Sequence, residues 1–360
     1  MIVINGKFLL QNITGTQRVA FELLKKMDEY YSHFNDKIVV AVPNREKIPE
    51  NLCLKNILLI PIGNLKGSLW EHINLARFVQ KNDAICFSFS GAFPLFVKRG
   101  VYYLHDIHPI QYKQYFSRRY SIYQKIIVNH VSKAKDIFVL TNSEHTKLNI
   151  LRWFPSLKER ISIVYPGWEH TKRYNLSDEV CVKWGVKKHQ YYVVLATLTK
   201  HKNLEIVLKV ASEEKDKIFV IIGQKPSNQV LRSLNLQVNT IDQKNIIFTN
   251  YINDEGVFSL IKYAKAVIVP SIFEGFGLPI LESLSLQTPV IASKIEAFQE
   301  LFSDVVTFFD PFNVSSLKEA LENLKFDEDK AKNLLEKYSW ERAILSLIKV
   351  YKIMREHNYF

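Results

Sequence analysis

The sequence feature that most constrains the fold is a strand, a glycine loop and a helix start that follow one another within residues 266–286. The segment opens with a short apolar, β-branched run, which predicts a buried parallel strand. Gly275 and Gly277 come next, and both allow a positive φ and a close approach of a ligand to the backbone. Pro279 then marks the start of a helix, where its missing N–H costs nothing. The free N–H groups and the dipole of such a helix start favour a bound anion such as a phosphate.

Two carboxylates flank this predicted phosphate site. Glu274 lies in the loop and Glu282 lies in the first turns of the helix. Sugars present hydroxyl donors, and carboxylates are natural acceptors for them. The two acids fit a ligand with hydroxyls on either side of a diphosphate. The alternative is that Glu274 is a solvated loop residue and Glu282 a residue on the helix surface.

The segment EGFGLPILE, from Glu274 to Glu282, resembles the E-x7-E motif of the retaining family-4 glycosyltransferases, which have the GT-B fold. The match is specific because both acids, both glycines and the proline are in place. The resemblance implies that Glu274 contacts hydroxyls of the transferred sugar and that Glu282 holds the nucleotide ribose. It also implies backbone contacts to the sugar and diphosphate from Phe276, Gly277 and Leu278.

A second glycine loop lies near the N-terminus, between a predicted first strand and a helix over about 17–30. It lacks the GxGxxG dinucleotide fingerprint. Its segment T-G-T-Q-R resembles the T-G-x-Q-R stretch of many family-4 enzymes. The resemblance implies that Gly15 and Thr16 approach the diphosphate and the acceptor. Two roles stay open for Arg18: a contact with the diphosphate or the acceptor, or a salt bridge that caps the helix.

A His-Asp pair follows the strand predicted over 101–104. His105 and Asp106 would lie at the carboxyl end of a parallel strand, where such sheets place their sites. A histidine there can donate to a sugar hydroxyl or to a phosphate, although a histidine after a strand is also common as a structural residue. The resemblance implies that His105 contacts the donor sugar. For Asp106 we expect an orienting or structural role.

A cationic loop follows the first strand of the second half, predicted over 191–195. Lys202 stands at its end, and a cation between a strand and a helix can neutralise a diphosphate leaving group. The loop resembles the family segment G-x-L-x-x-R-K-N, with Ala196 in place of the usual glycine and a histidine in place of the arginine. The alternative is a solvated lysine beside a helix start. The resemblance implies four further donor-binding residues. His201 and Asn203 belong to this loop, and Tyr251 and Ile252 belong to a later loop that is expected to lie near the nucleotide base.

Charge is uneven along the chain. The net charge is +12, and residues 1–168 carry 23 Lys or Arg against 12 Asp or Glu, whereas the remainder carries 25 against 24. The basic first half indicates an anionic partner, such as a lipid surface, a nucleic acid or an acidic acceptor. The three cysteines are scattered, which indicates reduced thiols and a cytoplasmic protein. The first residues lack the basic start and the cleavage site of a signal peptide, so we expect them to form a strand. No apolar run approaches the length of a membrane span.

Residues 111–135 combine basic and aromatic side chains more densely than any other stretch. Such a pattern fits peripheral attachment to the inner face of the plasma membrane. It equally fits nucleic acid, or a helix whose basic side chains are simply solvated. The E-x7-E unit is not explained by nucleic-acid binding, so we expect no nucleic-acid partner.

Strands and helices alternate along the whole chain, which predicts an α/β protein. With the resemblance, we expect a GT-B fold of two doubly wound Rossmann-like domains that face a central cleft. The expected division is an acceptor-side domain at 1–168, a nucleotide-sugar domain at 169–340 and a helix at 341–360 that crosses back to the first domain.

The resemblance implies a retaining hexosyltransferase that uses a UDP- or GDP-linked sugar and no further cofactor. The acceptor would be a saccharide or a lipid-linked oligosaccharide in the synthesis of O-antigen, capsule or lipopolysaccharide. The D-x-D at 327–329 lies in a charged connection, so we expect no metal site. Two alternatives share the fold: a sugar-nucleotide epimerase and a non-catalytic binding subunit.

Overall fold

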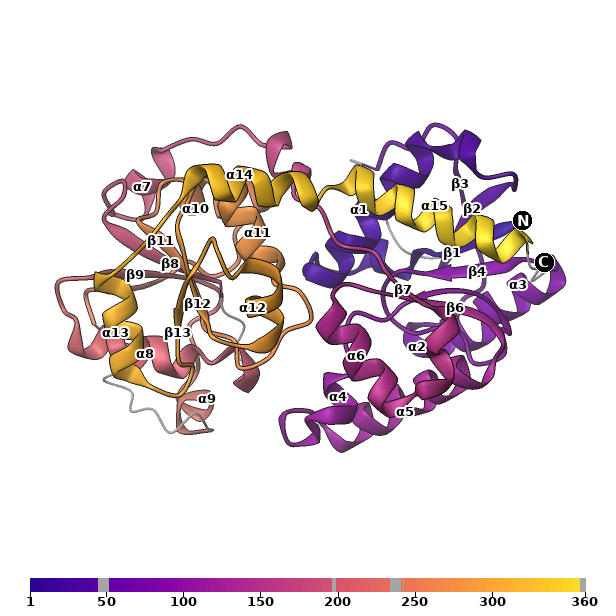
Figure 1. Ribbon diagram of the computed structural model, residues 1–360, viewed down its shortest axis with the longest axis horizontal. Coiled ribbons are helices and arrows are strands. Elements are labelled where there is room, and N and C mark those ends of the chain that lie inside the picture. The colour runs from indigo at the N-terminus through magenta and orange to yellow at the C-terminus, as the bar shows by residue number, and fades with distance from the viewer. Residues whose placement is uncertain (45–51, 196–198, 234–240, 242, 357–360) are drawn as a thin grey trace. The chain divides into compact units, whose positions relative to one another are not determined.

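The computed structural model describes residues 1–44, 52–195, 199–233, 241 and 243–356. The chain divides into two compact units (Figure 1). The first unit consists of Met1–Pro166 together with the residues from Ser339 onward, and the second consists of Gly167–Tyr338.

The first unit is built on a parallel sheet with the strand order β3-β2-β1-β4-β5-β6-β7 among its described residues. All of its strand pairs are parallel. The central strands are apolar on both faces, as expected for a sheet that is covered by helices on both sides. The strands are β1 Ile2–Asn5, β2 Ile38–Val42, β3 Leu58–Pro61, β4 Ile85–Ser88, β5 Arg99–Tyr103, β6 Asp136–Thr141 and β7 Ile161–Ile163.

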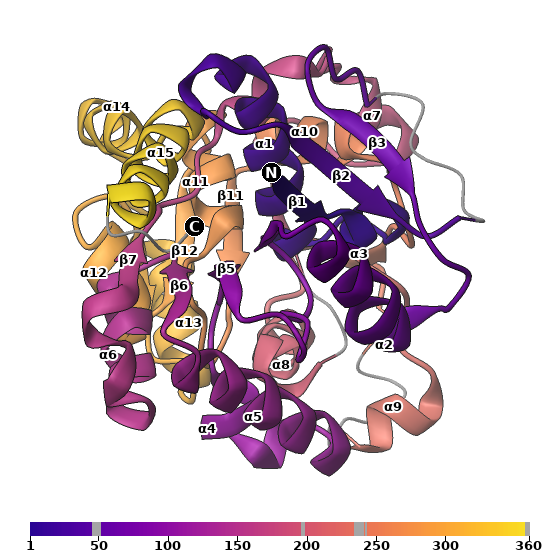
Figure 2. The same ribbon diagram turned by 90° about the vertical axis from the view of Figure 1, so that its right-hand side faces the viewer.

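Helices cover both faces of this sheet (Figure 2). One core contains α1 Gly15–Glu29 and α15 Trp340–Glu356, which lie side by side. The other core lies against the opposite face. Its helices are the helical segment over 67–81, α4 His108–Gln111, α5 Arg118–Lys133 and α6 Glu144–Trp153. The end of the chain therefore belongs to the core of the first unit.

The second unit is built on a parallel sheet with the order β10-β9-β8-β11-β12-β13. The strands are β8 Tyr191–Leu195, β9 Ile218–Ile222, β10 Ile246–Phe248, β11 Ala266–Val269, β12 Val290–Ser293 and β13 Thr307–Phe309. The helices are α7 Glu179–Lys183, α8 Leu204–Glu213, α9 Asn228–Ser233, α10 Asp254–Lys262, α11 Leu278–Ser285, α12 Glu296–Phe302, α13 Val314–Glu322 and α14 Glu328–Lys337. The side chain of Asp327, from the D-x-D, accepts from Lys330 N (3.0 Å) and caps α14.

Both sheets reverse their strand order at one point. In the first unit the chain runs outward from β1 to β3 and returns to place β4 beside β1. In the second it runs from β8 to β10 and returns to place β11 beside β8. Loops on the two sides of such a reversal diverge, so ligands bind at the carboxyl ends of these strands. This topology makes each unit a doubly wound α/β domain.

Three local details of the structure go beyond the sequence analysis. Helix α1 begins at Gly15, two residues before the expected start, so Gly15 and Thr16 belong to its first turn. The helical segment over 67–81 is not a regular α-helix, because a π-helical turn at Trp70–Leu75 lies between α2 Gly67–Leu69 and α3 Ala76–Lys81. Of the two loop glycines, Gly277 has a positive φ and Gly275 does not.

No helix in the described parts of the chain combines the length and the apolar character needed to cross a lipid bilayer.

Helix α15 offers a direct test of its packing. Leu347 is fully buried in the first core, so Leu347→Ala should lower the free energy of unfolding by about 2–5 kcal/mol. Leu345 lies on the same helix but is 48% exposed, so Leu345→Ala should change it by less than about 0.5 kcal/mol. Urea unfolding of the full chain measures both values, and equal effects of the two substitutions would contradict this packing.

Candidate functional site

The second unit brings two predicted residues into contact at its strand reversal. Lys202 ends a 3-10 turn after β8, and Glu274 lies in the loop after β11. The Lys202 ammonium forms an ion pair with Glu274 Oε1, and the Ser271 hydroxyl donates to the same oxygen at 2.8 Å. The two loops are also joined by a hydrogen bond from Ile272 N to His201 O (2.8 Å). Both side chains remain partly exposed, which leaves them accessible to a ligand.

The glycine loop leads directly into helix α11. Gly277 is the N-cap with φ 105° and ψ 48°, and a Cβ there would lie 2.6 Å from Phe298 Cε1. Only glycine fits without strain or a clash. No side chain caps the helix, so its first N–H groups are available to an anion. The side chains of Phe276 and Leu278 are buried, so these residues can reach a ligand only through their backbone.

Glu282 lies on α11 and is almost completely buried. Its Oε1 is 2.9 Å from Nε2 of the fully buried His170, which follows the entry of the chain into the second unit. Among the described residues, no partner is seen for Glu282 Oε2. One carboxylate oxygen is therefore fixed by the imidazole, and the other can accept from a hydroxyl.

The remaining predicted donor-site residues lie around these loops. The His201 ring stacks on Phe273, with centroids 4.9 Å apart. Asn203 has a left-handed conformation (φ 52°), and its amide donates to Pro311 O (2.8 Å), which makes it a structural link. Tyr251 is exposed and Ile252 half-buried in the loop between β10 and α10. Ala196, which stands in place of the glycine of the family segment, lies outside the described parts of the chain.

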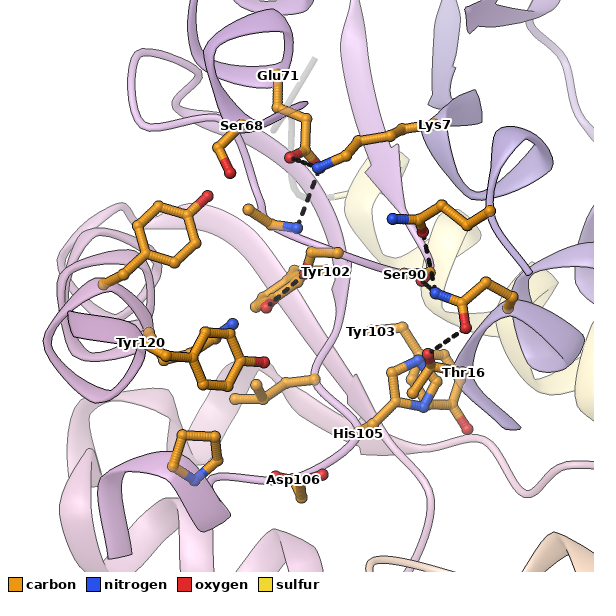
Figure 3. A pocket seen from close by; sticks show the side chains of 18 residues that line it. Lys7, Thr16, Ser68, Glu71, Ser90, Tyr102, Tyr103, His105, Asp106 and Tyr120 are labelled. Carbon is orange, nitrogen blue, oxygen red and sulfur yellow. Dashed lines mark hydrogen bonds and ion pairs between the residues drawn. The ribbon is translucent and has the colours of Figure 1, made fainter. Parts of the chain in front are cut away.

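The first unit holds a pocket of about 310 Å³ at its own strand reversal (Figure 3). Thr16 and His105 both line it, and so does Asp106. Gly15 does not line the pocket, but it lies in the same uncapped first turn of α1 as Thr16. Asp106 Oδ1 accepts from His108 N at 2.9 Å and so fixes the turn into α4.

His105 is held firmly. Its ring stacks on Tyr103 with centroids 4.4 Å apart, and Nε2 lies 2.8 Å from Phe89 O. A carbonyl only accepts, so Nε2 carries the proton and the neutral ring has its acceptor at Nδ1. Burial lowers the pKa of His105 below its usual value, against smaller opposing effects from Phe89 and Asp106. Sequence reasoning expected His105 to donate to a ligand; in this tautomer it accepts.

Three functional candidates escaped sequence reasoning: Lys7 and Glu71, which line the pocket of the first unit, and His170 in the second. Lys7 Nζ is 2.5 Å from Glu71 Oε2. Nothing local in the sequence marks these residues, because each gains its partner from a segment more than 60 residues away.

Within the described parts of the chain, no group of three or more His, Cys, Asp or Glu side chains is arranged to hold a metal ion.

Comparison with solved structures places this architecture in the GT-B class. The chain aligns with HepE from Anabaena, solved with UDP and glucose, at a TM-score of 0.71 and 16% identity, covering 98% of this chain and 99% of the other. Two Rossmann-like units with these strand orders are the GT-B fold.

Residues 177–339 match the family model described as "Glycosyl transferases group 1". It is 25% identical over 224 residues to the O-antigen chain mannosyltransferase RfbU of Salmonella typhimurium, covering 62% of this chain and 60% of that protein. It is 24% identical over 250 residues to an uncharacterized glycosyltransferase, MJ1607, of Methanocaldococcus jannaschii, covering 64% and 63%. The chain thus spans about three fifths of the length of these relatives.

The neutral state of the buried imidazoles predicts how stability depends on pH. Burial lowers the pKa of His105 and of His72, so the unfolded chain binds more protons near its ordinary histidine pKa of 6.5. The contribution of these two neutral histidines to the free energy of unfolding should be complete above pH 6.5 and should decrease as the pH falls below 6.5. Urea unfolding between pH 7.5 and 5.5 measures this loss. His105→Gln should show a smaller loss than the native chain, and an unchanged slope would contradict the buried neutral state.

Proposed function

We propose that the protein transfers a hexose from a nucleotide-diphosphate sugar to a saccharide or lipid-linked oligosaccharide acceptor, with retention of anomeric configuration. The second unit binds the donor and the first unit binds the acceptor. The setting is surface polysaccharide synthesis, such as that of O-antigen or lipopolysaccharide. Support for this setting comes from the name of the relative RfbU, an O-antigen chain mannosyltransferase.

One observation carries the proposal. Lys202 and Glu274 meet at the strand reversal of the second unit, beside the uncapped start of α11. A cation and free N–H groups suit a diphosphate, and a carboxylate suits sugar hydroxyls. The donor requires both in one place.

The residues divide the chemistry between them. The Lys202 ammonium and the α11 N–H groups stabilise the charge that develops on the departing diphosphate. Glu274 accepts from sugar hydroxyls and orients the ring, and Glu282 Oε2 accepts from the ribose. The acceptor hydroxyl then attacks from the side that the diphosphate leaves, and its proton passes to an oxygen of the departing diphosphate. Positioning and stabilisation of the leaving group supply the rate enhancement. Because protein groups meet the diphosphate charge, we propose a metal-independent reaction.

His105 has a proposed role in the first unit. Its Nδ1 accepts from a hydroxyl of the sugar in transfer, while Phe89 and Tyr103 fix the ring. Thr16 and the first N–H groups of α1 lie in a turn that no side chain caps, so they can donate to a diphosphate oxygen.

Transfer assays with UDP- and GDP-hexoses test this assignment. Lys202→Ala should lower the transfer rate by about 100-fold or more, because one stabilising charge on the leaving group is lost. Glu274→Gln should produce a loss of similar size. The matched control is Lys209→Ala, which removes an exposed lysine from α8 that pairs with Glu205 (2.6 Å); it should leave the rate unchanged.

Product analysis separates the alternatives. NMR of the purified product should show the anomeric configuration of the donor, and EDTA should leave the rate unchanged. A changed nucleotide sugar formed without acceptor would indicate an epimerase. Nucleotide-sugar binding without any turnover would indicate a non-catalytic subunit.

We further propose that α5 attaches the protein to anionic membrane. Its outward face combines cations with apolar side chains that are about half exposed: Arg118, Ile122, Lys125, Ile126 and Lys133. A hollow of about 370 Å³ lies at the basic start of the helix, lined in part by Lys113, Arg118 and Lys125. Cations beside exposed isoleucines fit an anionic lipid surface.

Vesicle sedimentation tests this attachment. The protein should bind phosphatidylglycerol vesicles more strongly than phosphatidylcholine vesicles, and added salt should weaken the binding. Replacing Arg118 and Lys125 by glutamine should reduce binding by about fivefold for each cation. Lys209→Gln is the control. Equal binding to both vesicle types, insensitive to salt, would refute the proposal.

A further inference from the structure

The pocket of the first unit contains a buried ion pair. Glu71 is fully buried, and Lys7, which follows β1, is partly exposed to the pocket. Figure 3 shows the two side chains meeting at one end of the pocket. A buried charge is costly unless it is paired and hydrogen-bonded, so this arrangement must be held by its surroundings.

The surroundings satisfy the Glu71 carboxylate. Oε1 accepts from Asn5 Nδ2 (3.0 Å) and from Ala92 N (3.2 Å), and Oε2 accepts from Lys7 Nζ (2.5 Å). Gly91 has φ 81°, and a Cβ there would lie 2.9 Å from Oε1, so the loop after β4 approaches the carboxylate as only glycine can.

The backbone that carries Glu71 is also irregular. Glu71 lies in the π-helical turn, a geometry that is rare and frequent at functional sites. Glu71 thus fixes the position of the Lys7 ammonium. An ammonium carries three protons, and in the described structure Glu71 is the one acceptor found for Nζ. Protons remain for a ligand in the pocket.

The other walls offer neutral groups. Aromatic rings, amides and hydroxyls predominate: Tyr102, Tyr103, Tyr120, Tyr123, Gln11, Gln17, Gln124, Thr16, Ser68 and Ser90. Among the described residues that line the pocket, Lys7 is the one Lys or Arg, and Glu71 balances its charge. The further charged group is Asp106. Apart from the N–H groups at the start of α1, the pocket therefore has no excess positive charge for a phosphate or a carboxylate, whereas amides, hydroxyls and aromatic faces suit a neutral sugar ring.

We propose that this pocket binds an uncharged sugar unit of the acceptor, and that Lys7, positioned by Glu71, is a specificity-determining residue. Lys7 donates to a sugar hydroxyl, and its balanced charge gives no advantage to an acidic sugar. The inference rests on the proposed function because it takes the ligand to be the acceptor. A volume of about 310 Å³ lies at the small end of the range for ligand pockets, roughly 300–1,000 Å³.

Sugar binding without any nucleotide sugar tests the inference. Saturation-transfer NMR on the full chain would compare methyl hexosides of gluco, galacto and manno configuration with the matching methyl uronides. At least one neutral hexoside should bind, and it should bind better than its uronide. Glu71→Gln removes one negative charge and leaves Lys7 unbalanced. The ratio of hexoside to uronide binding should then fall by about tenfold, because an added unit charge within a few ångströms is worth at least that factor at an effective dielectric constant near 20.

Two further variants complete the charge cycle. Lys7→Met with Glu71→Gln restores the original net charge of the lining, so the preference for the neutral ring should return. Lys7→Met alone keeps the Asn5 and Ala92 bonds to Glu71 and should weaken hexoside binding several-fold through the lost hydrogen bond. This single variant decides the question if Glu71→Gln fails to fold. Lys26→Gln removes a surface lysine of α1 that pairs with Glu29 (2.5 Å), and should change nothing.

The inference fails if no neutral hexoside binds, if the uronide binds better to the native chain, or if the Glu71 and Lys7 variants leave binding unchanged. These results are independent of the transfer assay. If the Glu71→Gln variant transfers sugar normally and keeps the same acceptor preference, the inference fails while the proposed function stands. If the neutral hexoside binds as expected but no nucleotide sugar supports transfer, only the proposed function is overturned.

Discussion

The reversal of strand order in each parallel sheet is the constraint on which the candidate sites depend. It separates the loops after β1 and β4 in the first unit, and those after β8 and β11 in the second. In both units, polar side chains gather near this reversal, at the carboxyl ends of the strands; in the first unit the loop after β5 adds His105 and Asp106. Topology therefore explains where chemistry can occur, and the side chains explain which chemistry it is.

The two units treat charge differently. In the second unit, a partly exposed lysine and a partly exposed carboxylate form an ion pair beside free helix N–H groups. A charged ligand can therefore replace this ion pair with contacts of its own. In the first, the carboxylate is buried and fully hydrogen-bonded, so the pair is a fixed part of the pocket wall. This contrast fits the charged donor proposed for the second unit and the uncharged acceptor sugar proposed for the first.

Apolar runs predicted the alternation of strands and helices, and the resemblance at 274–282 predicted the GT-B fold, because both are local signals in the sequence. They also placed Lys202 and Glu274 on loops of the same sheet edge. Local signals did not reveal the π-helical turn, the tautomer of His105, or the partners of Glu71 and Glu282. Each of these depends on contacts between residues far apart in sequence, such as Lys7 with Glu71 or His170 with Glu282.

The π-helical turn has a consequence for the length of its helix. A π turn accommodates one residue more than an α-helical turn, and each residue of an α-helix advances the chain by about 100° around the axis. Because the extra residue is absorbed within this turn, deleting one residue within 70–75 would let the helix become regular while the segments on either side keep their directions. Glu71 and His72 would lose the wide turn that now sets the directions of their side chains. Homologous chains that lack this one residue would differ in the pocket of the first unit, even where every other element aligns.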